Sequence, residues 1–254
     1  MKNTLALRGR CALVTGASKG IGRAIAAALQ QSGAVVHLLA RSESSLRQAA
    51  AGMEEQHKTG NGDDAGIKQS APVIHVCDVS DHLAVERLVK DLEHDGVIPD
   101  ILVNNAGMFR IASVAETSSD LFRKTLNTNL AGPFQLVRAF LPEMLDAGNG
   151  DIVTIGSVAD RRIFPGNGAY AASKFGARAL HEVLRAELAG SGVRCSLVSP
   201  AQTNTSLWDN SGSADAGAPD RAAMLRADDV AEAVLWILTR ARDVNIDELR
   251  LSRS

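Results

Sequence analysis

A tyrosine, a lysine and a serine carry the clearest chemical possibility in this sequence. Tyr170 is the chain's single tyrosine, and Lys174 follows it at a spacing that places both side chains on one face of a helix. Ser157 comes earlier, shortly after the apolar run at 152–155. A phenol, an ammonium group and a hydroxyl that converge would be well suited to protonating a carbonyl oxygen. A reductant for that carbonyl would have to be bound by the rest of the chain.

A glycine-rich loop between a predicted strand and a predicted helix is the first candidate for a cofactor site. The run at 11–15 is apolar without alternation, which is typical of a strand buried on both faces of a parallel sheet. The loop follows at 16–22 and leads into an alanine-rich helix at 23–31. Backbone N–H groups at such a helix start can receive a pyrophosphate. The glycine spacing differs from the usual dinucleotide fingerprint, so an ordinary glycine turn explains the loop alone equally well.

Positive charge follows the second predicted strand, at 34–40. An NAD site would carry a carboxylate here for the ribose hydroxyls, but the sequence has Ala40 and Arg41, with Lys19 in the glycine loop. Two cations without an acid favour a cofactor with a 2′-phosphate, so we expect NADP(H) rather than NAD(H). A solvated arginine at the start of a helix is the alternative.

Polar residues also follow the third and fourth predicted strands, at 72–77 and 101–103. Asp78 could accept a hydrogen bond from an adenine amino group, or it could cap the helix that starts near Asp81. The Asn-Asn-Ala-Gly turn at 104–107 has small residues that would let a cofactor lie against the backbone. In parallel sheets, ligands bind beyond the carboxyl ends of the strands, where all these residues are expected.

The alternation of strand-like and helix-like segments predicts the fold. Further strands are expected at 152–155, 193–198 and 245–251, and a long helix at 168–189. No repeat, proline-rich linker or charge run divides the chain. We therefore expect one α/β domain over residues 1–254, a doubly wound parallel sheet of the Rossmann type with about seven strands and helices on both faces.

Asn129 is unusual because it falls inside a predicted helix at 118–144, where asparagine is a poor helix former. A functional amide or an anchor for water would explain it, and an ordinary exposed side chain is the alternative. Pro133 lies in the same stretch and is expected to bend the helix.

The composition excludes several other classes of protein. Apolar residues make up 45% and charged residues 22%, and the net charge of −2 indicates neither a nucleic-acid nor a membrane partner. Cys11, Cys77 and Cys195 lie in strand-like runs without zinc-type spacing, so we expect free thiols, a reducing compartment and no metal. The first residues resemble no signal peptide and no membrane span, which predicts a cytoplasmic location. The polar stretch at 59–70 is expected to be a mobile surface insertion.

In combination these motifs resemble the short-chain dehydrogenase/reductase family. The resemblance covers nearly the whole chain and rests on the glycine loop, Asp78, the Asn-Asn-Ala-Gly turn, and the set Asn129, Ser157, Tyr170 and Lys174. It implies an NAD(P)-dependent enzyme that transfers a hydride between NADP(H) and a carbonyl or secondary alcohol, with that set as its catalytic residues. The residues implied to bind the cofactor are Gly16, Ser18, Lys19, Gly20, Ile21, Gly22, Arg41, Asp78, Val79, Asn105, Ala106, Gly107, Tyr170, Lys174, Pro200, Thr203 and Thr205.

The chemistry of these residue types fits the implied roles. A phenol has an ordinary pKa of about 10, and the Lys174 ammonium is expected to lower the pKa of Tyr170 toward neutrality. Ser157 would donate to the substrate oxygen as charge develops there. Asn129 would anchor a water that links Lys174 to solvent. The family also implies a homotetramer or homodimer with the two long helices in the interface.

Some residues depart from the family's usual pattern. Gly156 stands where many relatives carry a second serine. In the turn after the sixth strand, Pro200 and Thr205 fit the pattern, whereas Ala201 and Thr203 do not. This turn is still expected to hold the nicotinamide carboxamide. The C-terminus lacks the usual Asp-Gly-Gly ending and is more similar to carbonyl and 3-hydroxy-acid reductases.

The substrate pocket is expected to form from Met108, Phe109, residues 158–167 and a flexible lid at 203–219 that includes Leu207 and Trp208. Arg161 and Arg162 could meet an acidic or phosphorylated group, and a solvated pair is the alternative. The expected substrate is a ketone or a 3-oxoacyl compound.

Two other classes of function stay open at this point. An NADP(H)-binding regulatory or scaffold protein would keep the fold without turnover, although the complete catalytic set argues against it. A nucleotide-sugar epimerase or dehydratase shares the Tyr-x3-Lys spacing but usually needs a larger C-terminal domain than the segment after Pro200 provides.

Overall fold

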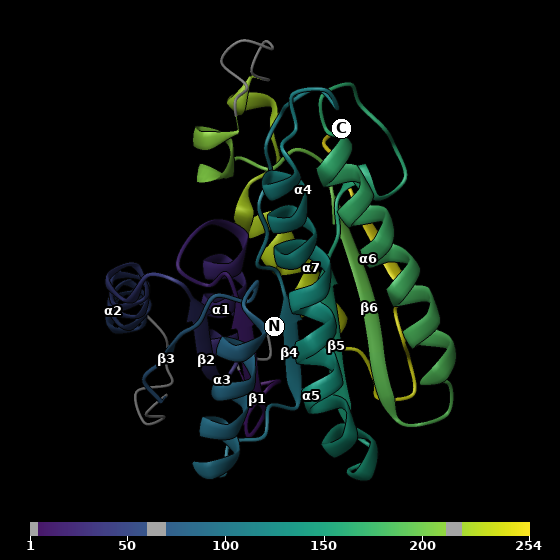
Figure 1. Cartoon of the computed structure of the whole chain (residues 1–254). Helices are drawn as coiled ribbons and strands as arrows, with labels where there is room; N and C mark the ends of the chain where they lie inside the picture. Colours follow the sequence, from purple (N-terminus) through teal and green to yellow (C-terminus); the bar gives the residue numbers. More distant parts are fainter. Residues whose placement is uncertain (1–4, 60–69, 212–219) are drawn as a thin grey trace.

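A seven-stranded parallel sheet organises the molecule (Figure 1). The computed structural model describes residues 5–59, 70–211 and 220–254. Within them the strand order is β3-β2-β1-β4-β5-β6-β7. The strands are β1 (Cys11–Thr15), β2 (Val35–Ala40), β3 (Val73–Val76), β4 (Ile101–Asn104), β5 (Gly150–Ile155), β6 (Val193–Pro200) and β7 (Glu248–Leu251). The expected fold class, a doubly wound Rossmann-type sheet, is confirmed.

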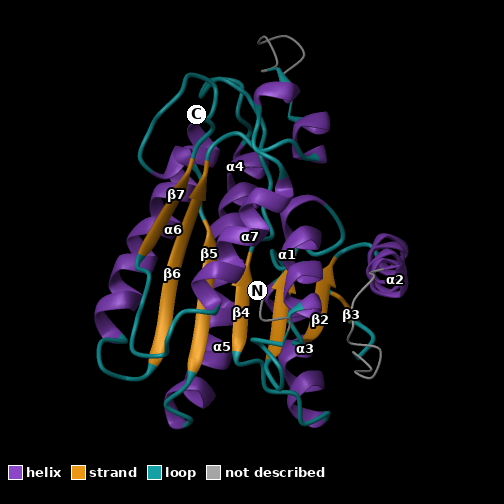
Figure 2. Cartoon of the chain, turned by 180° about the vertical axis from the view of Figure 1, so that it is seen from behind, coloured by secondary structure: helices purple, strands orange, loops and turns teal. Residues whose placement is uncertain are grey.

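Helices cover both faces of the sheet. They are α1 (Gly20–Gln31), α2 (Glu43–Thr59), α3 (His82–His94), α4 (Ser119–Leu126), α5 (Gly132–Asp146), α6 (Gly168–Glu187) and α7 (Ala227–Leu238). Helices α3, α5 and α6 pack on one face, and α1 and α7 on the other (Figures 1 and 2). No helix among the described segments is long and apolar enough to cross a membrane.

Burial on both faces explains why the strands are apolar without alternation. In β1, Leu13 points to the α3 and α5 side, whereas its neighbour Val14 points to the α1 and α7 side. Leu102 and Val103 in β4 divide between the two faces in the same way. Because β1 pairs with β2 on one side and β4 on the other, the order of the strands reverses there, which places a crevice at their carboxyl ends.

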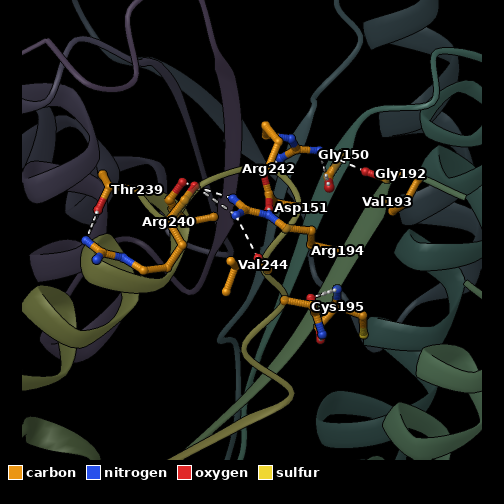
Figure 3. A network of polar contacts seen from close by, with 12 residues as sticks. Gly150, Asp151, Gly192, Val193, Arg194, Cys195, Thr239, Arg240, Arg242 and Val244 are labelled. Carbon is orange, nitrogen blue, oxygen red and sulfur yellow. Dashed lines mark hydrogen bonds and ion pairs between the residues drawn. The ribbon is translucent and has the colours of Figure 1, made fainter. Parts of the chain in front are cut away.

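Near the amino ends of the strands, a buried carboxylate binds three arginines. Figure 3 shows two of them, Arg194 and Arg242, around Asp151. Asp151, near the start of β5, accepts hydrogen bonds from Arg10 at 2.8 Å, Arg194 at 2.6 Å and Arg242 at 2.7 Å. The guanidinium of Arg194 also donates to four backbone carbonyls, those of Leu238, Arg240, Ala241 and Val244. The network therefore ties β5 and β6 to the segment that follows α7.

The structure divides the predicted helix at 118–144 in two. A π-helical turn, Asn127–Ala131, separates α4 from α5. Pro133 is the second residue of α5, directly after the π turn, in a helical path that continues from α4. The asparagine that is a poor helix former, Asn129, is at the centre of the π turn.

The predicted last strand at 245–251 is shorter in the structure, where β7 begins at Glu248. Before β7, the side chain of Asn245 makes the hydrogen bonds to β6 that a strand backbone would make. Its Oδ1 accepts from the N–H of Cys195 at 3.0 Å, and its Nδ2 donates to the carbonyl of Cys195 at 3.1 Å. The predicted insertion at 59–70, apart from its two end residues, and residues 212–219 of the predicted lid lie outside the described residues.

Candidate active site

A cleft of about 610 Å³ opens at the carboxyl edge of the sheet. Its walls come from the turns that follow β1, β2, β3, β4, β5 and β6, and from the start of α6. Of the residues expected to bind a cofactor, every one except Gly22 lines this cleft. Of the four expected catalytic residues, Ser157, Tyr170 and Lys174 line it, and Asn129 lies behind the wall.

The glycine loop is fixed to the turn after β4. Thr15 Oγ1 accepts from the N–H groups of Asn105 and Ala106, each at 2.9 Å. The Asn105 amide in turn donates to the Thr15 carbonyl at 2.8 Å. A Cβ atom on Gly22 would lie 2.4 Å from the Asn105 Nδ2 atom, so this glycine permits the packing of loop on turn and does not line the cleft. Gly16 and Gly20 have positive φ angles, which glycine adopts without strain.

Positive side chains line the end of the cleft beside β2. Lys19 and Arg41 are both there, together with the hydroxyl groups of Ser42 and Ser45, which the sequence motifs did not single out. The signal for these serines is their place directly after Arg41, where hydroxyls could add to a phosphate site.

Asp78 follows β3 in the same part of the cleft and does not cap a helix. Its Oδ1 accepts from Ser80 N at 3.0 Å and Ser80 Oγ at 2.7 Å, whereas Asp81 caps α3. Burial raises the pKa of Asp78, but the Ser80 hydrogen bonds and the charges of Arg41 and Lys124 outweigh it and hold the pKa below its ordinary value. An ionised carboxylate therefore faces the cleft.

Asn129 connects two walls of the cleft through the π turn. Its Oδ1 accepts from Met108 N at 2.8 Å, and its Nδ2 donates to Met108 O at 3.0 Å and to Ser173 Oγ at 2.9 Å. Ser173 immediately precedes Lys174 on α6. The asparagine thus fixes the turn after β4 against the helix that carries Tyr170. Single π turns inside helices often occur at functional sites.

Tyr170, Ser157 and Lys174 meet at the centre of the cleft. The Ser157 side chain is close enough to Tyr170 to act on the pKa of the phenol, which it lowers. Lys174 Nζ donates to the carbonyl of Ile155 at 2.8 Å and lies 5.7 Å from the centre of the phenol ring. Ser157 also caps a short 3-10 helix, Val158–Asp160, by accepting from Ala159 N at 3.1 Å. The end of β5 therefore positions both partners of the phenol.

The pKa of the phenol does not follow the expectation from sequence. Burial raises the pKa of Tyr170, the Ser157 side chain opposes this, and the negative charge of Asp160 raises it further, so the pKa lies above its ordinary value. Burial lowers the pKa of Lys174 to about 8, although Asp160 opposes that shift. The expected lowering of the phenol's pKa is therefore not found, because burial is the largest contribution and raises the pKa.

Aromatic side chains form the wall next to Tyr170. The Phe109 ring packs edge-on against Tyr170, with centroids 4.8 Å apart, and against Trp208 at 5.4 Å. Trp208 Nε1 donates to the Thr203 carbonyl at 3.1 Å, which holds the indole in place. The other residues lining this side are Met108, Ile111, Val158, Ala159, Phe164, Pro165, Asn167 and Leu207.

The two arginines considered for an acidic substrate do not line the cleft. Arg161 pairs with Asp160 at 2.7 Å and with Glu248 at 2.5 Å, and Arg162 is exposed. Among the described residues that line the cleft, the cations are Lys19, Arg41 and Lys174, and Lys174 is on the same helix as Tyr170. No group of three or more metal-ligating side chains occurs in the part of the chain that the structure describes.

The glycine loop with positive groups beside β2, and an acid–base cluster in the same cleft, define an NAD(P)-dependent oxidoreductase. The chain belongs to the short chain dehydrogenase family, whose sequence profile matches residues 10–216. The predicted family and class of enzyme are therefore confirmed.

Relatives agree with this assignment. The chain is 37% identical over 247 residues to glycine betaine reductase ATRR of Emericella nidulans, a match that covers 96% of this chain and only 18% of that protein. It is 33% identical over 244 residues to an uncharacterized oxidoreductase of Staphylococcus saprophyticus, covering 96% and 97% of the two chains.

Solved structures of similar proteins contain bound nucleotide. An alcohol dehydrogenase from the archaeon Thermococcus sibiricus, complexed with 5-hydroxy-NADP, has a TM-score of 0.81 and 30% identity, covering 95% of each chain. A metagenomic short-chain oxidoreductase in complex with NADP has a TM-score of 0.80 and 31% identity, covering 98% of this chain and 99% of the other.

Proposed function

We propose that the protein transfers a hydride between NADP(H) and a carbonyl or secondary-alcohol substrate, with Tyr170 as general acid and base. The observation that carries this proposal is the meeting of Tyr170, Ser157 and Lys174 in the cleft that the glycine loop also lines. Bound NADP(H) would supply or accept the hydride. Similar structures with bound NADP support the choice of cofactor.

The residues present fit such a cofactor. The positive φ angles of Gly16 and Gly20 leave the loop open at the start of α1, where N–H groups can bind a pyrophosphate. Arg41, Lys19, Ser42 and Ser45 would bind a 2′-phosphate, and the ionised Asp78 would accept from the adenine amino group. The remaining proposed contacts are Ser18, Ile21, Val79, Asn105, Ala106, Gly107, Tyr170, Lys174, Pro200, Thr203 and Thr205, with Gly22 in a packing role.

The protein's own groups would handle the proton. In reduction, the Tyr170 hydroxyl donates its proton to the carbonyl oxygen, and its raised pKa keeps it protonated for that task at neutral pH. Ser157 donates a hydrogen bond to the same oxygen as charge develops. Lys174, with a pKa of about 8, can return a proton toward the phenol. Asn129 holds the walls together and is proposed to anchor the water that connects Lys174 to solvent.

The lining favours an uncharged, apolar carbonyl compound within the expected class of ketones and 3-oxoacyl compounds. Phe109, Trp208 and Phe164 give aromatic surface next to the phenol, and Arg161 is neutralised by its two carboxylate partners. A substrate with a free carboxylate would lose its hydration at this wall without gaining a dedicated cation.

Turnover with a panel of carbonyl compounds tests the proposal. NADPH oxidation should be faster with aryl and alkyl ketones or aldehydes than with 3-oxo acids of similar size. Tyr170→Phe should lower kcat/KM by about 10²–10⁴, the contribution of a general acid, while NADPH binding is retained. NADPH binding without turnover of any carbonyl, unchanged in Tyr170→Phe, would instead favour a regulatory or scaffold protein.

The proposal includes assembly and location. Exposed apolar side chains on α5 and α6, among them Phe134, Phe175 and Val183, favour a homotetramer or homodimer. The two helices cover the same face of the sheet (Figure 1). Gel filtration tests this, and a clean monomer would contradict it. Three free cysteines favour the cytoplasm. Neither a nucleic-acid nor a membrane partner is proposed.

A further inference from the structure

A second carboxylate lies immediately behind the proposed catalytic residues. Asp160 ends the short helix that Ser157 caps, and no part of it is exposed to solvent. Its Oδ2 accepts from the Ser199 hydroxyl and from Ser157 N, the latter at 3.4 Å, and its Oδ1 accepts from Arg161 Nε at 2.7 Å. Burying an ionised carboxylate costs several kcal/mol unless partners compensate it, so its presence needs an explanation.

The glycine directly after β5 makes room for this carboxylate. A Cβ atom on Gly156 would lie 2.7 Å from Asp160 Oδ2 and 2.7 Å from Ser199 Oγ. The space beneath Ser157 that a side chain at 156 would enter is occupied by the Asp160–Ser199 pair.

The charge of Asp160 reaches the cleft. Arg161 forms ion pairs with both Asp160 and Glu248, and so connects Asp160 to β7. Glu248 also pairs with Arg178 on α6 at 3.1 Å and with Arg250. The charged or titratable side chains that interact with Asp160 are Arg161, Tyr170 and Lys174. The negative charge favours the protonated forms of both Tyr170 and Lys174.

We propose that Asp160 is a positioning residue of the reaction: its carboxylate fixes the Ser157 turn and supplies a buried negative charge behind Tyr170 and Lys174. The proposal rests on the proposed function. As a consequence, the protonated forms of Tyr170 and Lys174 are favoured, and the phenol can donate its proton to a carbonyl oxygen. The group acts through its neighbours, because it is separated from the cleft by the residues it holds.

The single tyrosine allows a direct test without any substrate. Ionisation of the phenol is followed by its ultraviolet absorbance as pH is raised, and Tyr170 is the sole tyrosine that contributes. In Asp160→Asn the midpoint should move to lower pH than in the wild type. The matched control is Asp151→Asn, because Asp151 is a similarly buried, arginine-bound carboxylate at the other end of β5. Its midpoint should equal that of the wild type.

Equal midpoints in Asp160→Asn and the wild type, or an equal shift in Asp151→Asn, would overturn the proposal. Circular dichroism at each pH confirms that the fold persists. If Asp160→Asn fails to fold, Asp160→Ser, which keeps a small polar side chain beside Ser199 and removes the carboxylate, carries the same test.

Kinetics give the second readout. In Asp160→Asn, kcat/KM for carbonyl reduction should fall roughly tenfold because Ser157 is less well placed, a smaller loss than removal of an oxyanion donor itself. The pH at which reduction declines should also move lower, which a purely structural role would not cause. A shifted absorbance midpoint without turnover of any carbonyl would leave the role of Asp160 intact and reject the proposed function.

Discussion

The two ends of β5 carry buried carboxylates in opposite electrostatic situations. Asp151, at the amino end, is surrounded by three arginines, and Arg194 among them also binds four backbone carbonyls. Asp160, just beyond the carboxyl end, has one arginine partner and otherwise accepts from a hydroxyl and a backbone N–H. The negative charge of Asp151 is therefore balanced by its arginine partners. The charge of Asp160 is balanced less completely, so it also acts on the ionisable groups of Tyr170 and Lys174.

This comparison also explains why the substrate side of the cleft is apolar. Of the described cations that line the cleft, Lys19 and Arg41 lie toward β2 and Lys174 binds the Ile155 carbonyl, whereas Arg161 is paired with two carboxylates outside the cleft. The end of the cleft beside β2 would therefore bind the cofactor's phosphate, and the end beside Tyr170 would hold the carbonyl group that reacts.

The largest effect on stability is expected at Asp151, at the amino end of β5. Asp151→Ala should lower the free energy of unfolding by about 3–5 kcal/mol, because it leaves three arginine side chains without their shared carboxylate. Urea denaturation at neutral pH measures this. The control is Asp100→Ala, which removes one partly exposed partner of Arg10 and should cost less. Equal losses of unfolding free energy in the two variants would contradict a special stabilising role for Asp151.

A smaller effect concerns a pair of histidines, the buried His37 and the half-buried His75. His37 and His75 stack between β2 and β3, with ring nitrogens 2.8 Å apart. Burial, and then the neighbouring His75, lower the pKa of His37 to about 4. The unfolded chain therefore binds more protons than the folded one between about pH 6.5 and 4, so stability is lost as pH falls through that window.

For this pair, the loss in unfolding free energy between pH 7 and pH 4 should be roughly 2–3 kcal/mol from His37 alone. His37→Gln should flatten that part of the curve, measured by urea denaturation at several pH values. The exposed His82 gives a matched control, since His82→Gln should leave the slope unchanged. If the unfolding free energy of His37→Gln changed with pH as steeply as that of the wild type, His37 would not be a buried neutral histidine.

The smallest effect tests the separation of charge along the cleft. Arg41→Asp should weaken NADPH binding at least about tenfold more than NADH binding, because a repulsive carboxylate replaces a partner of the 2′-phosphate. Fluorescence titration of both nucleotides gives the ratio. Arg47→Asp changes an arginine on α2 that pairs with Glu43 and does not line the cleft, so it should leave the ratio unchanged.

The fold is predictable from the sequence because its signals are local. Apolar runs at β1 and β4 predict strands buried on both faces, and residues after strand ends converge by topology. Ser157, Tyr170 and Lys174 can thus be grouped from their positions in the sequence. The role of Asp160 cannot, because it depends on where Ser199 and the space beside Gly156 fall after packing. The direction of the Tyr170 pKa shift is wrong in the sequence-based expectation for a similar reason, since desolvation is a property of the folded surroundings.

The contact between Gly156 and Asp160 also constrains the order in which this sequence can change. A side chain at 156 would collide with both Asp160 Oδ2 and Ser199 Oγ, each 2.7 Å from the position of its Cβ atom, whereas a smaller residue at 160 or 199 creates no such collision. A substitution at 156 is therefore obstructed until these neighbours have changed. Variants selected from random libraries should acquire a larger residue at 156 only in chains that already carry changes at 160 and 199.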